Sequence, residues 1–201
     1  QDWPGRLGYW AVGVPPSGPM DPLSFRFANR LVGNDEGAAA IETTLSGPTL
    51  KFNSDTVICL TGAKLIATVD GEPVPYWQAF AVKAGQVLKV GGVTGPGTRA
   101  YIAVQGGIDV PNYLGSRSTF TLGKFGGHAG RSLRTSDVLH IGAMRARASK
   151  EVSLPAALKP RLAHSWDIGV LYGPHGAPDF FAPEYIDTFF AAEWEVHYNS
   201  N

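Results

Sequence analysis

The 201-residue sequence has little cysteine, no excess charge of either sign, and no long apolar run. Its single cysteine, Cys59, excludes a disulfide within one chain, and its apolar neighbours predict a buried side chain rather than a nucleophile. Seventeen basic residues balance seventeen acidic ones, which indicates no nucleic-acid-binding face. No run approaches the roughly 18 apolar residues of a membrane helix, and no secretion signal is visible. We therefore expect a cytoplasmic protein that binds neither nucleic acid nor membrane.

Metal and nucleotide motifs are also missing. The sequence contains neither a Walker pattern nor a glycine fingerprint between a strand and a helix. Five histidines are scattered without metal-ligand spacing, so no metal site is expected. They are His128, His140, His164, His175 and His197.

Short apolar or alternating runs, separated by turn residues, dominate the chain up to residue 141. The 25 glycines and 15 prolines indicate many turns. Many short runs at close spacing favour a closed barrel or a sandwich over an α/β fold. Asp70-Gly71 between two runs is a strong hairpin signal. The predicted strands are residues 49–52, 56–61, 64–69, 78–82, 86–90, 99–104 and 138–141.

The most unusual stretch, residues 13–26, joins a stiff loop to a helix. Two glycines and four prolines fix the loop, Asp21 suits the N-cap, Pro22 suits the first helical position, and Gly33 is a plausible stop. Such a loop aims backbone N–H groups and a positive dipole end at one point, which suits an anion or a polarised carbonyl. Ser17 could donate a hydrogen bond there. The alternative is a rigid turn that only connects two elements.

Two other segments could carry chemistry. Arg6, among glycines near the start, could bind a carboxylate or carbonyl, or be a surface residue of a turn. Asp2 could orient Arg6, although an exposed acid is the stronger expectation. The long connection 106–131 is rich in glycine, hydroxyls and cations, and loops of this length are usually functional or disordered. The alternative for it is a structured β-bulge loop.

A change of composition near residue 143 predicts that the chain leaves a first domain, 1–145, through a linker, 146–164. Residues 165–201 then repeat the opening pattern weakly, with a predicted strand at 166–172, a loop, a helix at 183–190 and a strand at 193–198. This stretch is too short to close a barrel, so we expect a truncated second domain.

Several motifs resemble one family. The segments DWPGR at 2–6, PPSGPM at 15–20, ETTLSGP at 42–48 and FGGHAGR at 125–131 are similar to the allophanate hydrolase subunit 2 family, also described as biotin-dependent carboxylase-like. Within it, the first, second and last segments most resemble urea carboxylase. The resemblance implies a mainly β fold: a cyclophilin-like β-barrel with a short helix, followed by the start of a second, incomplete barrel.

The resemblance also implies an activity. It places the chain in the carboxyltransferase region, which moves a carboxyl group from carboxybiotin to urea and yields allophanate. Biotin would be carried on a separate carrier domain, and ATP would be used by a biotin carboxylase domain. No pattern for either domain is visible here, so we expect a fragment that is inactive in isolation. Two alternatives stay open: a subunit of an ATP-dependent 5-oxoprolinase, and a non-catalytic regulatory or binding subunit.

Taken together, the residue types and the resemblance define a pool of candidate site residues. The expected catalytic residues are Arg6, Asp21, Lys124, His128 and Arg131. The residues expected to bind substrate or biotin are Ser17, Gly18, Met20, Arg117, Gly126 and Gly127. The cations of the pool could stabilise a developing oxyanion, and no member can be singled out as the base.

Overall fold

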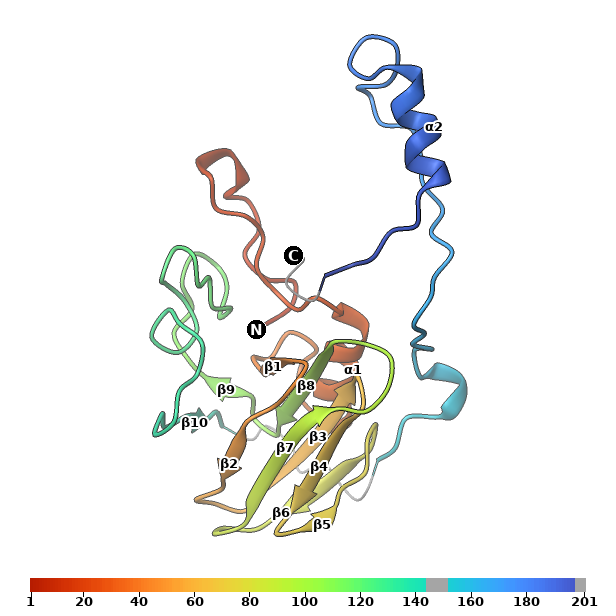
Figure 1. Ribbon diagram of the computed structural model, residues 1–201. Coiled ribbons are helices and arrows are strands. Elements are labelled where there is room, and N and C mark those ends of the chain that lie inside the picture. Colours follow the sequence, from red (N-terminus) through yellow and green to blue (C-terminus); the bar gives the residue numbers. More distant parts are fainter. Residues whose placement is uncertain (144–151, 198–201) are drawn as a thin grey trace. The chain divides into compact units, whose positions relative to one another are not determined.

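The computed structural model describes residues 1–143 and 152–197 and divides the chain into two units. Unit 1 is Gln1–Leu162, and unit 2 is Ala163–Asn201. Figure 1 shows the strands gathered in unit 1 and the helix α2 in unit 2. Within the described ranges, no helix is long and apolar enough to cross a membrane.

Unit 1 contains two four-stranded antiparallel sheets and a short two-stranded one. The first sheet has the order β1 (Ile41–Thr44), β8 (Arg99–Val104), β3 (Thr56–Gly62) and β6 (Ala79–Val82). The second has the order β2 (Thr49–Lys51), β7 (Val87–Val93), β4 (Leu65–Val69) and β5 (Glu72–Pro73). The short sheet pairs β9 (Ile108–Asp109) with β10 (His140–Ile141).

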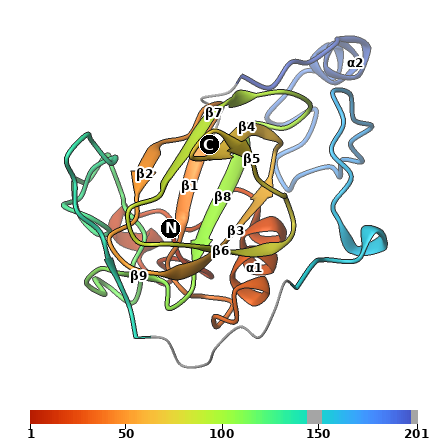
Figure 2. The same cartoon turned by 90° about the horizontal axis from the view of Figure 1, so that it is seen from below.

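Alternation along the strands places apolar side chains in two cores. Ile102 of β8 packs with Leu60 of β3 and Leu88 of β7 in the core between the two sheets. Tyr101, the neighbour of Ile102, points to the other face and packs with Phe25 of α1 (Pro22–Leu31). The first sheet is therefore buried on both faces, between the second sheet and α1 (Figure 2). The mainly β class is confirmed.

The loop-to-helix prediction is confirmed in detail. Asp21 is the N-cap of α1, and its carboxylate accepts hydrogen bonds from the backbone N–H and the hydroxyl of Ser24. Pro22 occupies the first helical position, and Gly33 follows the helix with φ 79°. The cap satisfies a backbone donor that the first turn of a helix leaves free.

The hairpin predicted from Asp70-Gly71 is also present between β4 and β5, where Val69 pairs with Glu72. Both turn residues have positive φ, 50° and 95°, which is the geometry that an Asp-Gly pair favours. Of the seven strands predicted up to residue 141, the one at 99–104 has the predicted bounds and the other six have shifted ends, whereas β1, β5 and β9 were not predicted. β5 and β9 have only two residues each, too few for a pattern to show.

The segment predicted as a linker belongs to unit 1 over its described residues 152–162. Residues 146–151 are outside the described residues. Ser153 forms a β-bridge with Gln78, and Leu154 is buried beside Trp77. A short 3-10 helix follows at Ala156–Leu158.

Unit 2 contains the predicted helix, α2 (Pro183–Ala191), but the two predicted strands are wrong over the residues described. Residues 166–172 and 193–197 are in no strand, and Tyr198 lies outside the described residues. A strand requires a hydrogen-bonded neighbour, and residues 163–197 offer none. The apolar character of residues 166–172 therefore did not indicate a strand.

Candidate functional site

Two charged side chains near the start of the chain are buried, and the first is Asp2. Only 8% of Asp2 is exposed, so the expected surface acid is wrong. Its Oδ1 accepts hydrogen bonds from the hydroxyls of Ser116 and Ser118, both at 2.6 Å. Its Oδ2 accepts one from the backbone N–H of Arg117 at 2.7 Å. Asp2 thus fastens the N-terminal segment to the long loop that follows β9.

Arg6, the second charge, is fully buried. Its Nε donates to the carbonyl of Tyr113 at 3.1 Å, and its Nη2 donates to the carbonyl of Ser118 at 2.9 Å. The guanidinium lies over the ring of Phe125, 4.9 Å from the ring centroid. Its Nη1 donates to Ser17 Oγ at 2.8 Å. Arg6 therefore connects the loop of residues 13–20 with the long loop.

The 13–20 loop is held from a second side by the first sheet. Glu42 of β1 accepts a hydrogen bond from the backbone N–H of Met20 at 2.9 Å. The hydroxyl of Tyr101 accepts one from the N–H of Asp21 at 2.7 Å. Burial and the nearby Glu42 carboxylate raise the pKa of Tyr101, which keeps the phenol neutral. The loop backbone is thus fixed while Ser17 stays half-buried.

The distal part of the long loop forms a separate ionic cluster around Asp137. Arg131 donates to both oxygens of this carboxylate at 2.7 Å, and the backbone N–H of Arg134 donates to it at 2.7 Å. His128 Nε2 lies 3.5 Å from the same carboxylate. His128 and Arg131 are therefore brought together by a residue that sequence reasoning missed.

The remaining candidates are held less tightly. Arg117 reaches Asp109 at 3.4 Å, with its side chain 41% exposed. Lys124 is exposed. The backbone N–H of Gly18 donates to the side-chain oxygen of Gln1 at 3.3 Å.

Two predicted ligand-binding glycines face protein atoms. A Cβ on Gly126 would lie 2.2 Å from the carbonyl oxygen of Ser118 and 2.7 Å from Nη2 of Arg6. A Cβ on Gly127 would lie 1.8 Å from the hydroxyl oxygen of Thr119. The close approach that these glycines permit is made by the loop itself.

The structure therefore groups the candidate residues in three places. Arg6, Ser17 and Gly126 share one buried cluster with Asp2 and Ser118. Met20 and Asp21 are held at the first sheet, while His128 and Arg131 surround Asp137. The contributions of Ser118 and Asp137 were not predicted, and Asp2 was considered only as a weaker alternative, because the local sequence around a buried polar residue does not identify its distant partner.

Comparison with known proteins assigns the family. A family model described as carboxyltransferase domain, subdomain A and B, matches residues 12–201. The chain belongs to this carboxyltransferase family.

Relatives of the carboxyltransferase chain include large enzymes and smaller subunits. It is 52% identical to a urea amidolyase of Saccharomyces cerevisiae over 206 residues, which is all of this chain and 11% of the relative. It is 37% identical to a 5-oxoprolinase subunit of Escherichia coli over 197 residues, 98% of this chain and 61% of the subunit. The crystal structure of the K. lactis urea amidolyase matches the whole chain with a TM-score of 0.90 at 48% identity, covering 13% of that protein. The chain thus corresponds to a segment of urea amidolyase and spans about a tenth of its length.

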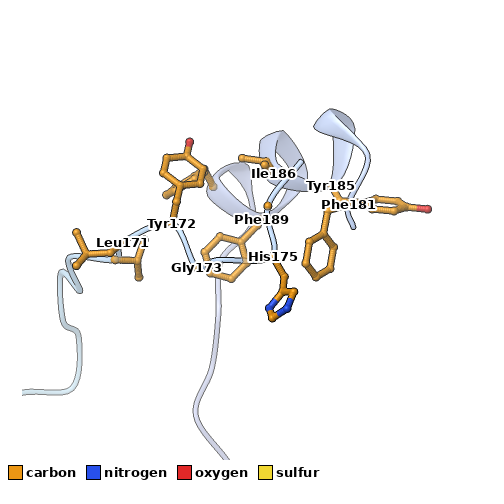
Figure 3. Close-up of a pocket in the computed structure, with 11 residues that line it drawn as sticks. Leu171, Tyr172, Gly173, His175, Phe181, Tyr185, Ile186 and Phe189 are labelled. Carbon is orange, nitrogen blue, oxygen red and sulfur yellow. The ribbon is translucent and has the colours of Figure 1, made fainter. Parts of the chain in front are cut away.

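Unit 2 of the carboxyltransferase chain has an apolar pocket of about 470 Å³ (Figure 3). Leu171 and Tyr172 line the pocket from the segment that precedes α2, and Ile186 and Phe189 line it from α2 itself. His175 is among its few polar side chains and stacks edge-on against Phe180. None of the residues predicted to form the site is among those that line this pocket. Within the part of the chain that the structure describes, no cluster of three or more His, Cys, Asp or Glu side chains could hold a metal ion.

The Asp137 cluster should make the carboxyltransferase fold sensitive to acid. Hydrogen bonds from Arg131 and the Arg134 N–H hold the pKa of Asp137 well below its ordinary range. The stabilising contribution of the ionised Asp137 is complete above the unfolded-state pKa of about 4 and is lost as the pH falls below that value.

The difference in free energy of unfolding between wild type and Asp137→Asn should be largest at pH 6–7 and shrink below pH 4. Denaturant titrations across this range test this. The control is Asp109→Asn, because the side chain of Asp109 is 63% exposed. A wild-type-to-Asp137→Asn difference that does not change with pH would contradict the assignment.

Proposed function

We propose that this chain is part of the carboxyltransferase site of a biotin-dependent urea carboxylase, which transfers a carboxyl group from carboxybiotin to urea and forms allophanate. The observation that carries the proposal is the 52% identity to a urea amidolyase over the entire chain. The identities to two 5-oxoprolinase subunits are lower, 37% over 197 residues and 41% over 136 residues. A putative urea carboxylase of Emericella nidulans, 44% identical over the whole chain, supports the same choice.

Ser17 is the residue we assign to contact the substrate or biotin. The guanidinium of Arg6 can only donate hydrogen bonds, so it occupies a lone pair of Ser17 Oγ and leaves the hydroxyl proton for another acceptor. Urea, biotin and a transferred carboxyl group all present oxygen acceptors, so the chemistry of this donor fits them. Biotin, delivered by a carrier domain elsewhere in the protein, would supply the carboxyl group.

The other candidates divide by what they contact. Arg6 and Asp21 are positioning residues, since Arg6 is fully buried and the Asp21 carboxylate caps α1. Lys124 and Arg117 are exposed or half-exposed cations, which can favour a negatively charged group near the loop. His128 and Arg131 belong to the Asp137 cluster, where Nε2 of His128 lies 3.5 Å from the carboxylate and Arg131 binds both of its oxygens.

The partners follow from the same assignment. A carboxyltransferase needs the biotin carboxylase domain that uses ATP, the biotin carrier domain and the remainder of its own domain. The urea amidolyase and urea carboxylase relatives are long enough to contain them, since this chain spans 11% to 16% of their length. We place the enzyme in the cytoplasm.

Ser17→Ala in the full-length protein tests the proposal. With ATP, bicarbonate and urea, we expect allophanate formation to fall on the order of a hundredfold or more, the usual cost of removing one directed donor. ATP cleavage without urea should continue, because another domain performs it. Ser54→Ala, on an exposed turn before β3, is the matched control.

The same assay separates the alternatives. Replacing urea by 5-oxoproline should give no substrate-dependent turnover. Turnover with 5-oxoproline and none with urea would assign the chain to the 5-oxoprolinase relatives instead. Absence of turnover with either compound would favour a non-catalytic binding subunit. Undiminished allophanate formation by Ser17→Ala would remove Ser17 from the site.

A further inference from the structure

The buried cluster of unit 1 contains a continuous chain of hydrogen bonds from Asp2 to Ser17. Its links are Asp2 to the Ser118 hydroxyl at 2.6 Å, the Ser118 carbonyl to Arg6 at 2.9 Å, and Arg6 to Ser17 at 2.8 Å. We propose that Asp2 is a positioning residue that acts through Ser118 and Arg6 to orient the Ser17 hydroxyl. The kinetic part of this inference rests on the proposed function.

At the first link, hydrogen bonds hold both the hydroxyl and the backbone N–H of Ser118. The Asp2 carboxylate accepts from its hydroxyl, and the hydroxyl oxygen accepts from the backbone N–H of Asp2 at 3.0 Å. The Ser118 N–H donates to Ser116 Oγ at 3.0 Å, and Ser116 itself donates to Asp2. Hydrogen bonds to an ionised carboxylate are short and about twice as strong as neutral ones. Asp2 therefore organises the backbone around Ser118.

The second link orients Arg6. A guanidinium is planar, and its donors form a rigid fork. Two carbonyl acceptors, those of Tyr113 and Ser118, together with the Phe125 ring set the plane of this fork. Once the plane is set, Nη1 points at Ser17 Oγ. A displaced Ser118 carbonyl would rotate the plane and move Nη1 away from Ser17.

The charge of Asp2 is a second reason to expect that this residue acts on Ser17 through Ser118 and Arg6. The groups that accept hydrogen bonds from Arg6 are neutral, as are those that donate to the Asp2 carboxylate. The charge on Asp2 strengthens the hydrogen bonds that its carboxylate accepts from the hydroxyls of Ser116 and Ser118. A neutral residue at position 2 therefore weakens the hydrogen bonds that hold Ser118, and through the Ser118 carbonyl the hold on Arg6, even where the shape of the side chain is preserved.

The kinetic test uses the full-length protein and a double-mutant cycle. Asp2→Asn preserves shape but removes the charge, and we expect kcat for allophanate formation to fall ten- to a hundredfold, the scale of a small misplacement in a site. In the Ser17→Ala background, Asp2→Asn should have no further effect, because the residue through which it acts is gone. Asp55→Asn, with its side chain 61% exposed, should leave both backgrounds unchanged. A merely structural role predicts the same fall in both backgrounds, and that result would overturn the proposal.

A second measurement does not depend on activity. Hydrogen–deuterium exchange should rise in Asp2→Asn in peptides covering residues 113–120 and, through the relay, in those covering 13–20. Asp55→Asn should alter neither. Faster exchange at 113–120 with unchanged exchange at 13–20 would also overturn the proposal. Should Asp2→Asn fail to fold, Ser118→Ala removes the same link and is expected to give the same two signatures. A wild type inactive with urea but with the expected exchange pattern would reject the proposed function and retain the relay.

Discussion

Arg6→Met is expected to lower the free energy of unfolding of unit 1 by about 2–5 kcal/mol. The substitution keeps an unbranched stem and removes the guanidinium from a fully buried site. The carbonyls of Tyr113 and Ser118 then lose their donor, and each buried acceptor without a partner costs about 1–3 kcal/mol. Ser17 Oγ also loses the hydrogen bond that it accepts from Nη1 of Arg6.

Arg30→Met is the matched control for this measurement. Arg30 also bears a guanidinium in an ion pair, with Glu36 at 2.8 Å, but its side chain is 65% exposed. Exposed ion pairs contribute about 0–1 kcal/mol. Denaturant unfolding of both variants, followed by circular dichroism, makes the comparison. Equal, small losses for the two substitutions would show that the Arg6 contacts contribute little to stability.

Gly126→Ala is expected to destabilise unit 1 by about 2–5 kcal/mol. Gly126 has φ 73°, which costs an alanine about 1–2 kcal/mol. The new methyl group would also lie 2.2 Å from the Ser118 carbonyl oxygen, a backbone atom that cannot rotate away. Overpacking of this kind adds about 1–3 kcal/mol. Because Ser118 and Arg6 both border Gly126, the variant should also disturb Ser17.

The same loop offers a control that separates these two costs. Gly115 has φ 78°, and a Cβ at this position meets no atom within 4 Å. Gly115→Ala should therefore show the backbone cost alone, about 1–2 kcal/mol. The difference between the two alanine variants measures the contact with Ser118 and Arg6. Equal unfolding midpoints for Gly115→Ala and Gly126→Ala would mean that the loop relaxes away from the added methyl group.

Local signals in the sequence predicted local structure well. Asp21-Pro22 located the start of α1, and Asp70-Gly71 located a hairpin, because caps and tight turns are determined by the residues that form them. The strand predicted at 166–172 failed for the complementary reason. Apolar residues in a row satisfy a strand's composition, but pairing depends on a neighbour that the pattern does not specify.

The candidate site was predicted in part. Arg6 and Ser17 were selected because loop chemistry makes such residues conspicuous, and the structure joins them. Asp2 was expected to be exposed, since its partner Ser118 lies 116 residues further along the chain. Gly126 was predicted to let a ligand approach the backbone, and the side on which a Cβ would lie is occupied by Ser118 and Arg6. Residue types indicate what chemistry is available, and only the tertiary contacts decide whether a ligand or the protein uses it.

The link between Arg6 and Ser118 has a consequence for synthesis on the ribosome. These residues are 112 positions apart, so the guanidinium emerges long before its acceptor exists. At about 5–20 residues per second, the interval is roughly 6–20 s. During this time the N-terminal segment has no buried place for its cation, which stays hydrated while the two sheets assemble. During synthesis, the Arg6 contact that holds the 13–20 loop therefore forms only after Ser118 has emerged.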